Sequence, residues 1–224
     1  MKSFIVMMLA VLFASTVHAA DCEKALFGWT ASDGTHIQGI LANEGVSKKN
    51  PRGYQNNPRD RGNFRNGLNC GGTAYGLACA QFPGINMKTV TKARAVQIYH
   101  DDQWAFLHGD EFKGQYLAYK VFDLEINMGA ATAVKLLQRT VNDLNGRSPD
   151  FPVTGRVTSE LVQWINDYTA PQILADGTDC NERRYRFFEH LKAVALIRYG
   201  SLIARNKNLS EFWGTWSDRA EYDR

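Results

Sequence analysis

The sequence predicts a helix-rich, mainly α domain with one long loop in its N-terminal half. Apolar residues recur at helical spacing in several separate segments between residues 32 and 205. The stretch from Gly45 to Leu77 instead carries glycines, asparagines and prolines, which are typical of loops and turns. The chain has 224 residues, 44% of them hydrophobic, which suits one domain, or one with a small appended subdomain, around a real core.

The first 20 residues have the pattern of a secretory signal peptide. Lys2 gives a basic start, residues 5–13 are an apolar run, and residues 17–19 form a small-x-small cleavage site, so we expect cleavage near Ala19 or Ala20. A transmembrane anchor is the alternative, but the run is too short to span a bilayer comfortably. No later stretch is long and apolar enough either, so we expect a soluble periplasmic or secreted protein.

Four cysteines remain after that cleavage: Cys22, Cys70, Cys79 and Cys180. An even number in an exported chain indicates two disulfides. Cys70 and Cys79 flank a glycine-rich turn, so we pair them, and Cys22 with Cys180 by elimination. The sequence alone allows three pairings.

A catalytic cysteine acting with His100, His108 or His190 is the functional alternative. It would need a free reactive thiol, and such a thiol does not persist in an oxidising compartment. The spacings give no recognisable Cys/His zinc site, and we expect neither a metal nor another cofactor.

A short helix is expected to end at Glu44. Ser32 or Asp33 can cap it, and the apolar residues between 37 and 41 share one face that Glu44 continues. Ionising a carboxyl group at the end of an apolar stripe is costly, so its pKa should rise, as a general acid near neutral pH requires. The alternative is a helix-end glutamate in solvent or paired with a nearby lysine or arginine.

The loop after Glu44 is basic, and at most one short hairpin is expected in it. Its cations are Lys48, Lys49, Arg52, Arg59, Arg61 and Arg65, against Asp60 alone, in a chain of net charge +3. A concentration of positive charge suits an anionic polymer such as the bacterial cell wall. Nucleic acid is not expected, because the loop has few aromatic residues to stack on bases. A solvated loop without a partner is the alternative.

Two helices are expected next. Residues 90–104 have a helical pattern, and the polar cluster 100–103 near its end either faces a cleft or lies in water. Residues 116–128 form a buried helix on which Asp123 and Asn127, four residues apart, project from the same side. Glu125 points elsewhere and is expected in solvent.

The remaining helices follow from the same periodicity and from their caps. A helix over 130–144 ends at Asn145-Gly146, and a loop covers 146–156. Thr158 or Ser159 caps the following helix, which Pro171 stops. A long amphipathic helix is expected over 181–205, a last short helix around 212–216, and a frayed tail over 218–224.

Three motifs in the long loop give a resemblance. Glu44-Gly45, then Tyr54-x-x-x-Pro-x-Asp60-x-Gly, then Gly-x-Thr73-x-Tyr75-Gly resemble the signature of glycoside hydrolase family 108, the bacterial and phage N-acetylmuramidases. The family usually shows Glu-Gly-Gly-Tyr without interruption. Here the second glycine is replaced by valine, residues 47–53 stand before the tyrosine, and a second insertion covers roughly 63–70.

Further positions resemble the same family. A stretch over 122–138 is similar to the C-terminal peptidoglycan-binding part of these proteins. The family's Tyr-x-x-x-Trp helix end has a counterpart in Tyr99 and Trp104, which is one residue longer. The resemblance implies that Asp123 and Asn127 lie on the helix behind the substrate groove, where Asn127 either lines the groove or makes a buried structural hydrogen bond.

The resemblance also implies a lysozyme-like site. Glu44 would be the general acid, and Asp60, in a polar loop, would stay ionised. Asp60 and the Thr73 hydroxyl could hold a water for an inverting reaction, whereas two carboxyls within about 5 Å would give a retaining one. Tyr54 and Tyr75 either line the groove or pin the long loop.

The sequence therefore predicts an exported N-acetylmuramidase that cuts the β-1,4 bond between N-acetylmuramic acid and N-acetylglucosamine in peptidoglycan. We expect a monomer with six or seven helices, a catalytic region over 21–110, a helical peptidoglycan-binding-like region over 111–217 and a tail over 218–224. A non-catalytic peptidoglycan-binding protein with the same fold is the alternative.

Overall fold

The computed structural model describes residues 46, 48–146, 151–170 and 180–221. It is helix-rich with two very small sheets, which confirms the mainly α prediction. The predicted signal peptide, the helix expected before Glu44, Glu44 itself and Cys22 lie outside the described residues. So does the side chain of Cys180.

The secondary structure divides into a strand-bearing part and a helical part. The first contains a 3-10 turn and four two-residue strands: η1 (Arg61–Asn63), β1 (Phe64–Arg65), β2 (Leu68–Asn69), β3 (Thr73–Ala74) and β4 (Leu77–Ala78). The second contains α3 (Lys92–Tyr99), the π-helical turn η2 (His100–Trp104), η3 (Gly109–Glu111), α4 (Gln115–Met128), α5 (Ala130–Leu144), α6 (Ser159–Tyr168), α7 (Cys180–Arg205), η4 (Lys207–Phe212) and α8 (Trp213–Glu221).

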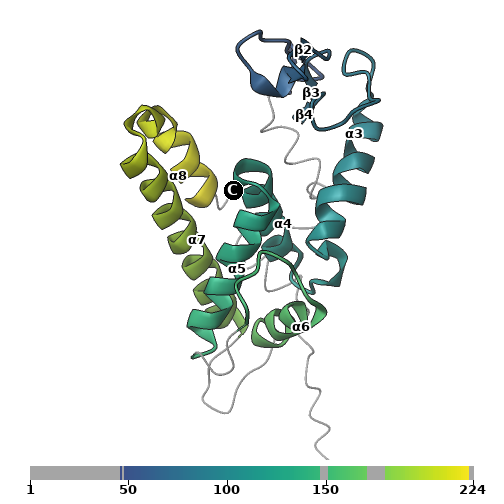
Figure 1. The fold of residues 1–224 in the computed structure, drawn as a ribbon. Coiled ribbons are helices and arrows are strands. Elements are labelled where there is room, and N and C mark those ends of the chain that lie inside the picture. Colours follow the sequence, from purple (N-terminus) through teal and green to yellow (C-terminus); the bar gives the residue numbers. More distant parts are fainter. Residues whose placement is uncertain (1–45, 47, 147–150, 171–179, 222–224) are drawn as a thin grey trace, which may run out of the picture.

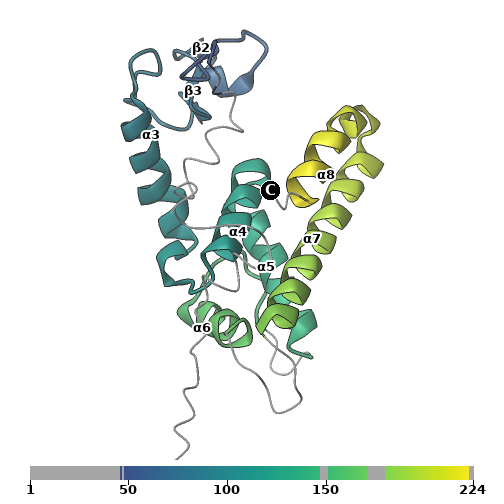
Figure 2. The same cartoon turned by 180° about the vertical axis from the view of Figure 1, so that it is seen from behind.

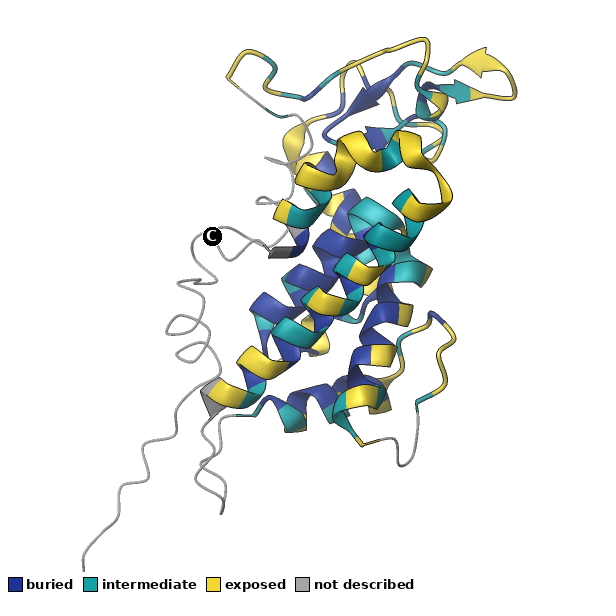
Figure 3. Cartoon of the chain, turned by 90° about the vertical axis from the view of Figure 1, so that its left-hand side faces the viewer, coloured by how far each residue is buried: buried dark blue, intermediate teal, exposed yellow. Residues whose placement is uncertain are grey.

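We call residues 48–90 the hairpin region and residues 92–221 the helical body. Figures 1 and 2 show the hairpin region at one end of the molecule, joined to the body through α3. Within the body α4 is central, because it packs against α5, α8, η2 and η3, while α5 packs against α7. The buried positions concentrate along the inner helices, whereas the hairpin region is largely half-buried or exposed (Figure 3).

The hairpin region contains two hairpins, where at most one was expected. β1 pairs with β2, and β3 pairs with β4, both antiparallel. Each is joined by two residues of positive φ, Asn66-Gly67 and Tyr75-Gly76, as a type I′ turn requires. The predicted disulfide between Cys70 and Cys79 is confirmed and ties the end of the first hairpin to the end of the second.

The helical body follows the sequence pattern closely. α5 has the predicted bounds, and the Thr158 hydroxyl caps α6 by accepting a hydrogen bond from the Leu161 amide at 3.2 Å. The frayed tail was misplaced, since α8 continues to Glu221. Trp216 stacks on Tyr199 at 5.0 Å, and Ala220, one turn later, is only 3% exposed, so the inward face of α8 extends past residue 218.

The helix predicted over 90–104 is continuous but changes its winding. α3 passes into a π-helical turn over His100–Trp104, a form that takes up one extra residue inside a helix. The segment from Tyr99 to Trp104 is the one that is a residue longer than the family pattern. The turn keeps Trp104 buried, edge-on to Phe122 with ring centroids 5.5 Å apart. Within the described residues, no helix is long and apolar enough to cross a membrane.

Candidate active-site cleft

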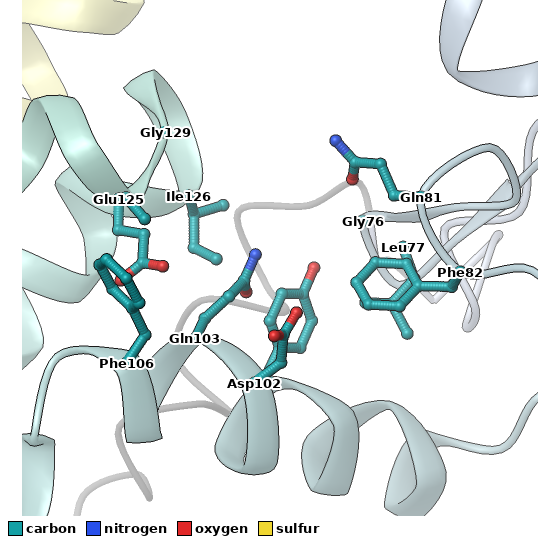
Figure 4. A pocket seen from close by; sticks show the side chains of 12 residues that line it. Gly76, Leu77, Gln81, Phe82, Asp102, Gln103, Phe106, Glu125, Ile126 and Gly129 are labelled. Atoms are coloured by element: carbon teal, nitrogen blue, oxygen red, sulfur yellow. The ribbon is translucent and has the colours of Figure 1, made fainter.

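A cleft of about 470 Å³ lies between the hairpin region and the helical body (Figure 4). The hairpin region supplies one wall, and the other comes from α3, the π-helical turn, Phe106 two residues after it, and the α4–α5 junction. The lining residues are Gly76, Leu77, Gln81, Phe82, Tyr99, Asp102, Gln103, Phe106, Glu125, Ile126, Gly129 and Ala130. The cleft therefore brings together segments about 50 residues apart in the chain.

The most unusual group in this wall is Glu125 on α4. Its side chain is 3% exposed, and its Oε2 atom has no hydrogen-bond partner in the part of the chain that the structure describes. Burial, and then the negative charge of Asp102, raise the pKa of Glu125 from 4.5 to about 8. The carboxyl group is therefore mostly protonated at neutral pH.

The expectation that Glu125 lies in solvent was wrong. From Tyr116 to Glu125 every side chain of α4 except Tyr119 is buried, because other elements pack around the helix. A helix that is buried nearly all round buries its charged residues as well.

The polar cluster after Tyr99 divides between the two environments that were considered for it. His100, Asp101 and Asp102 are exposed, and Asp102 also lines the cleft together with the half-buried Gln103. The Oε1 atom of Gln103 is buried and, like the Glu125 oxygen, has no hydrogen-bond partner among the described residues. Asp102 and Gln103 belong to the π-helical turn, which supplies polar side chains to this wall beside Glu125 of α4.

Asp60 and Thr73 are close neighbours in the hairpin region but do not line the cleft. The Asp60 carboxylate accepts a hydrogen bond from the Gly62 amide at 2.9 Å and caps η1. The Thr73 hydroxyl donates to Asn63 Oδ1 at 2.9 Å, and the Asn63 amide donates to the Asp60 carbonyl at 3.0 Å. Asn63 therefore links the two predicted site residues, which both take part in the hydrogen bonding of the loop.

Tyr54 and Tyr75 also hold the loop. The Tyr54 hydroxyl donates to the Gly71 carbonyl at 3.2 Å. Tyr75 is 5% exposed, and its carbonyl accepts a hydrogen bond from the Tyr99 hydroxyl at 2.9 Å. Neither tyrosine lines the cleft, although Gly76, the neighbour of Tyr75, does.

Asp123 and Asn127 lie on the predicted helix but away from the cleft. Asp123 is 4% exposed, and the Asn127 amide donates a hydrogen bond to the Tyr199 hydroxyl on α7. Asn127 was expected either to line the groove or to make a structural hydrogen bond, and the structure shows the hydrogen bond.

Most of the basic side chains of the hairpin region are in solvent. Lys48, Lys49, Arg59, Arg61 and Arg65 are exposed, and the half-buried Arg52 donates to the Lys88 carbonyl. Residues 48–146, 151–170 and 180–221 contain no cluster of three or more His, Cys, Asp or Glu side chains able to hold a metal ion.

Comparison with known proteins extends these observations. The glycosyl hydrolase 108 family model matches residues 37–129, a segment that includes the Glu44 motif and every lining residue of the cleft except Ala130. The structure of Brucella abortus SagA is similar over 83% of this chain and 87% of that chain, with 21% sequence identity and a TM-score of 0.54. At this identity the similarity shows the fold, which is mainly α and lysozyme-like. No curated protein matches the chain.

Proposed function

We propose that this chain is an exported peptidoglycan hydrolase that cleaves the β-1,4 bond between N-acetylmuramic acid and N-acetylglucosamine. The observation that carries the proposal is the match to the glycosyl hydrolase 108 model over residues 37–129. The matched segment contains both the Glu44-Gly45 motif and nearly the whole wall of the cleft. The volume of about 470 Å³ is within the range of about 300–1,000 Å³ that is usual for ligand sites.

Glu44 acts as the general acid in this proposal. Cleavage requires a proton on the leaving oxygen and stabilisation of an oxocarbenium-like centre. The apolar stripe that precedes Glu44 in the sequence favours a protonated carboxyl, as the first of these tasks requires.

Asp60 and Thr73 activate the attacking water in this proposal. Neither lines the cleft, but Thr73 lies on β3, whose partner strand β4 supplies Leu77 to it. Asp60 accepts a hydrogen bond from Gly62, and a carboxylate has about four acceptor positions, so capacity remains for a water molecule. Thr73 donates its proton to Asn63 and retains its own acceptor capacity for the same purpose.

The exposed cations of the hairpin region attract the anionic wall polymer. In this proposal the helical region over 111–217 adds Glu125, Ile126, Gly129 and Ala130 to a cleft whose other lining residues belong to the catalytic region over 21–110. The signal-peptide pattern of residues 1–20 directs the protein out of the cytoplasm.

The Glu44→Gln variant tests the acid. Loss of general acid catalysis lowers rates by about 10²–10⁴-fold, so we expect the release of reducing ends from purified peptidoglycan to fall by that factor. The matched control is Glu211→Gln, because Glu211 is an exposed glutamate on η4. Mass spectrometry of the wild-type digest should find N-acetylmuramic acid at the reducing ends; N-acetylglucosamine there would contradict the proposed bond.

A non-catalytic peptidoglycan-binding protein is the second candidate. The hydrogen bonds that Asp60 and Thr73 make within the loop favour it, since these bonds give both side chains a purely structural use. This candidate predicts that the wild-type protein sediments with insoluble peptidoglycan and releases no reducing ends. For the cysteine peptidase alternative, Cys70 and Cys79 are no longer available, because they form a disulfide.

A further inference from the structure

Two buried oxygen atoms without a hydrogen-bond partner lie in the same wall of the cleft. They are Oε2 of Glu125 and Oε1 of Gln103, and neither has a partner within the residues that the structure describes. Buried polar atoms in folded proteins are nearly always hydrogen-bonded, so each exception calls for an explanation. Two exceptions on adjoining elements of one cleft point to groups that receive a ligand.

The two side chains offer complementary hydrogen-bonding groups. The carboxyl of Glu125 is neutral at pH 7, because burial and the charge of Asp102 raise its pKa to about 8, and a neutral carboxyl donates one O–H hydrogen bond. The Oε1 atom of Gln103 can only accept. In Figure 4 the Glu125 carboxyl points from α4 toward the side of the cleft that Gln103 and Phe106 form.

Apolar side chains complete this part of the wall. Phe106 and Ile126 line the cleft on the same side as Glu125, and Phe82 contributes from the hairpin region. Among the described lining residues there is no lysine, arginine or histidine to balance an anion. A bound group should therefore be uncharged, with one acceptor, one donor and a small apolar part.

We propose that Glu125 and Gln103 form a subsite that recognises the acetamido group of an N-acetylated amino sugar. The acetamido carbonyl accepts the Glu125 O–H, the acetamido N–H donates to Gln103 Oε1, and the methyl group packs on Phe106 and Ile126. The assignment of the sugar rests on the proposed function. Glu125 and Gln103 are binding residues here and take no part in proton transfer to the leaving group.

The π-helical turn explains how Gln103 reaches this position. Because such a turn holds one extra residue, it changes the direction of the side chains relative to an uninterrupted α-helix. π-Helical turns occur frequently at functional sites. Here the turn supplies both Asp102 and Gln103 to the cleft.

A binding titration tests the subsite without depending on hydrolysis. The mature protein carrying Glu44→Gln is titrated at about pH 6, by calorimetry, with the trisaccharide of N-acetylglucosamine and with its fully deacetylated counterpart. We expect the acetylated sugar to bind at least about tenfold more tightly. Equal affinities, or tighter binding of the deacetylated, cationic sugar through Asp102 and Glu125, would overturn the proposal.

Variants separate the two side chains from the rest of the cleft. Glu125→Leu and Gln103→Ala should each weaken binding of the acetylated sugar about tenfold or more, while Glu125→Gln, which keeps a donor, should stay within about threefold. Glu182→Gln, an exposed position on α7, is the control. An unchanged affinity in both Glu125→Leu and Gln103→Ala would contradict the subsite.

The pH profile adds a measurement that a purely structural role would not change. The other titratable side chains among the described lining residues are Asp102 and Tyr99. Affinity with Glu125 present should fall between about pH 7 and 9 as the carboxyl ionises, and with Glu125→Gln it should stay level. If reducing ends are released but acetylation does not affect binding, the subsite fails and the proposed function stands. If acetylation strengthens binding but no reducing ends are released, the subsite stands and the proposed enzymatic function fails.

Discussion

The hairpin region and the helical body are held together by different interactions. In the body, most inner positions of α4, α5 and α7 are buried apolar side chains that pack on one another. The hairpin region contributes fewer such residues: Ala74, Tyr75, Leu77 and Cys79 in and beside its second hairpin, and Met87 and Val90 before α3. It relies on hydrogen bonds to its own backbone, on positive-φ turns and on one disulfide.

Asparagine side chains carry much of the hydrogen bonding in the hairpin region. Asn50 accepts from the Tyr54 amide at 3.0 Å and donates to the Tyr54 carbonyl at 3.1 Å. Asn57 accepts from the Arg59 amide at 2.9 Å, and Asn63 donates to the Asn57 carbonyl at 3.0 Å. An amide both donates and accepts, so it can satisfy backbone groups that no sheet or helix pairs.

Gly72 shows how closely the backbone of the hairpin region is packed. Its φ is +91°, and a Cβ atom there would lie 2.5 Å from the Gln55 carbonyl oxygen. That carbonyl accepts the hydrogen bond of the Thr73 amide at 2.8 Å, which holds the loop against the second hairpin. The region therefore depends on local conformation, and the body on burial. We infer that the cleft lies between a cooperatively stabilised wall and a locally stabilised one.

The largest expected effect is a loss of stability when a core side chain of the helical body is truncated. Phe122 is 0% exposed and meets Tyr99 and Trp104 edge-on at centroid distances of 6.2 and 5.5 Å. Phe122→Ala should lower the free energy of unfolding by about 3–5 kcal/mol, through lost burial and the cavity left behind. Urea unfolding measures it, with Ile197→Ala, 72% exposed on α7, as the control. A loss no larger than that of the control would show that α4 is not the centre of the core.

The next effect should be confined to the hairpin region. Cys70 and Cys79 close a loop of nine sequence positions, for which the chain-entropy model gives about 2–3 kcal/mol. Replacing both by alanine should speed hydrogen exchange of the amides over 62–80 and leave the protection of α5 nearly unchanged. An equal loss of protection in α5 would mean that the two regions unfold as one unit.

The contrast between a body stabilised by burial and a hairpin region stabilised by local conformation explains which parts of the fold the sequence could predict. The bounds of α5 and the cap of α6 follow from apolar periodicity and a threonine hydroxyl, two local signals that the packing of the body reinforces. The hairpins have weaker signals. Asn66-Gly67 is a favoured type I′ pair, but Tyr75 adopts a positive φ that bulky residues rarely take. The glycine-rich segment between Cys70 and Cys79 therefore indicated a turn and not the second hairpin.

The site was predictable only in part. Asp60 and Thr73, which a family pattern suggested, are linked through Asn63 but lie outside the lining of the cleft, so their catalytic role stays a prediction. Glu125 was placed in solvent although the helix over 116–128 was expected to be buried, and the structure leaves that helix no solvent side at Glu125. The apolar residues that surround it on nearly all sides of the helix were the available sign that any charge on α4 would be buried.

The last prediction concerns that buried carboxyl, an exception to the apolar packing of the body, whose effect is small within any one pH unit. The pKa of Glu125 is raised from 4.5 to about 8 in the folded protein, first by burial and then by the charge of Asp102. Between these values the unfolded chain ionises while the folded one keeps its proton. The contribution of the Glu125 carboxyl to the free energy of unfolding is therefore fully present below about pH 4.5 and is lost as the pH rises to about 8.

The expected slope is a loss of at most about 1.4 kcal/mol of unfolding free energy per pH unit within that window. Glu125→Gln removes the titrating group, so the variant should gain stability relative to the wild type as the pH rises from about 5 to 8. Urea unfolding at several pH values measures the difference, and Glu211→Gln, exposed on η4, should run parallel to the wild type. Parallel curves for Glu125→Gln as well would place this carboxyl in water, and the wall that α4 presents to the cleft would then be open rather than dry.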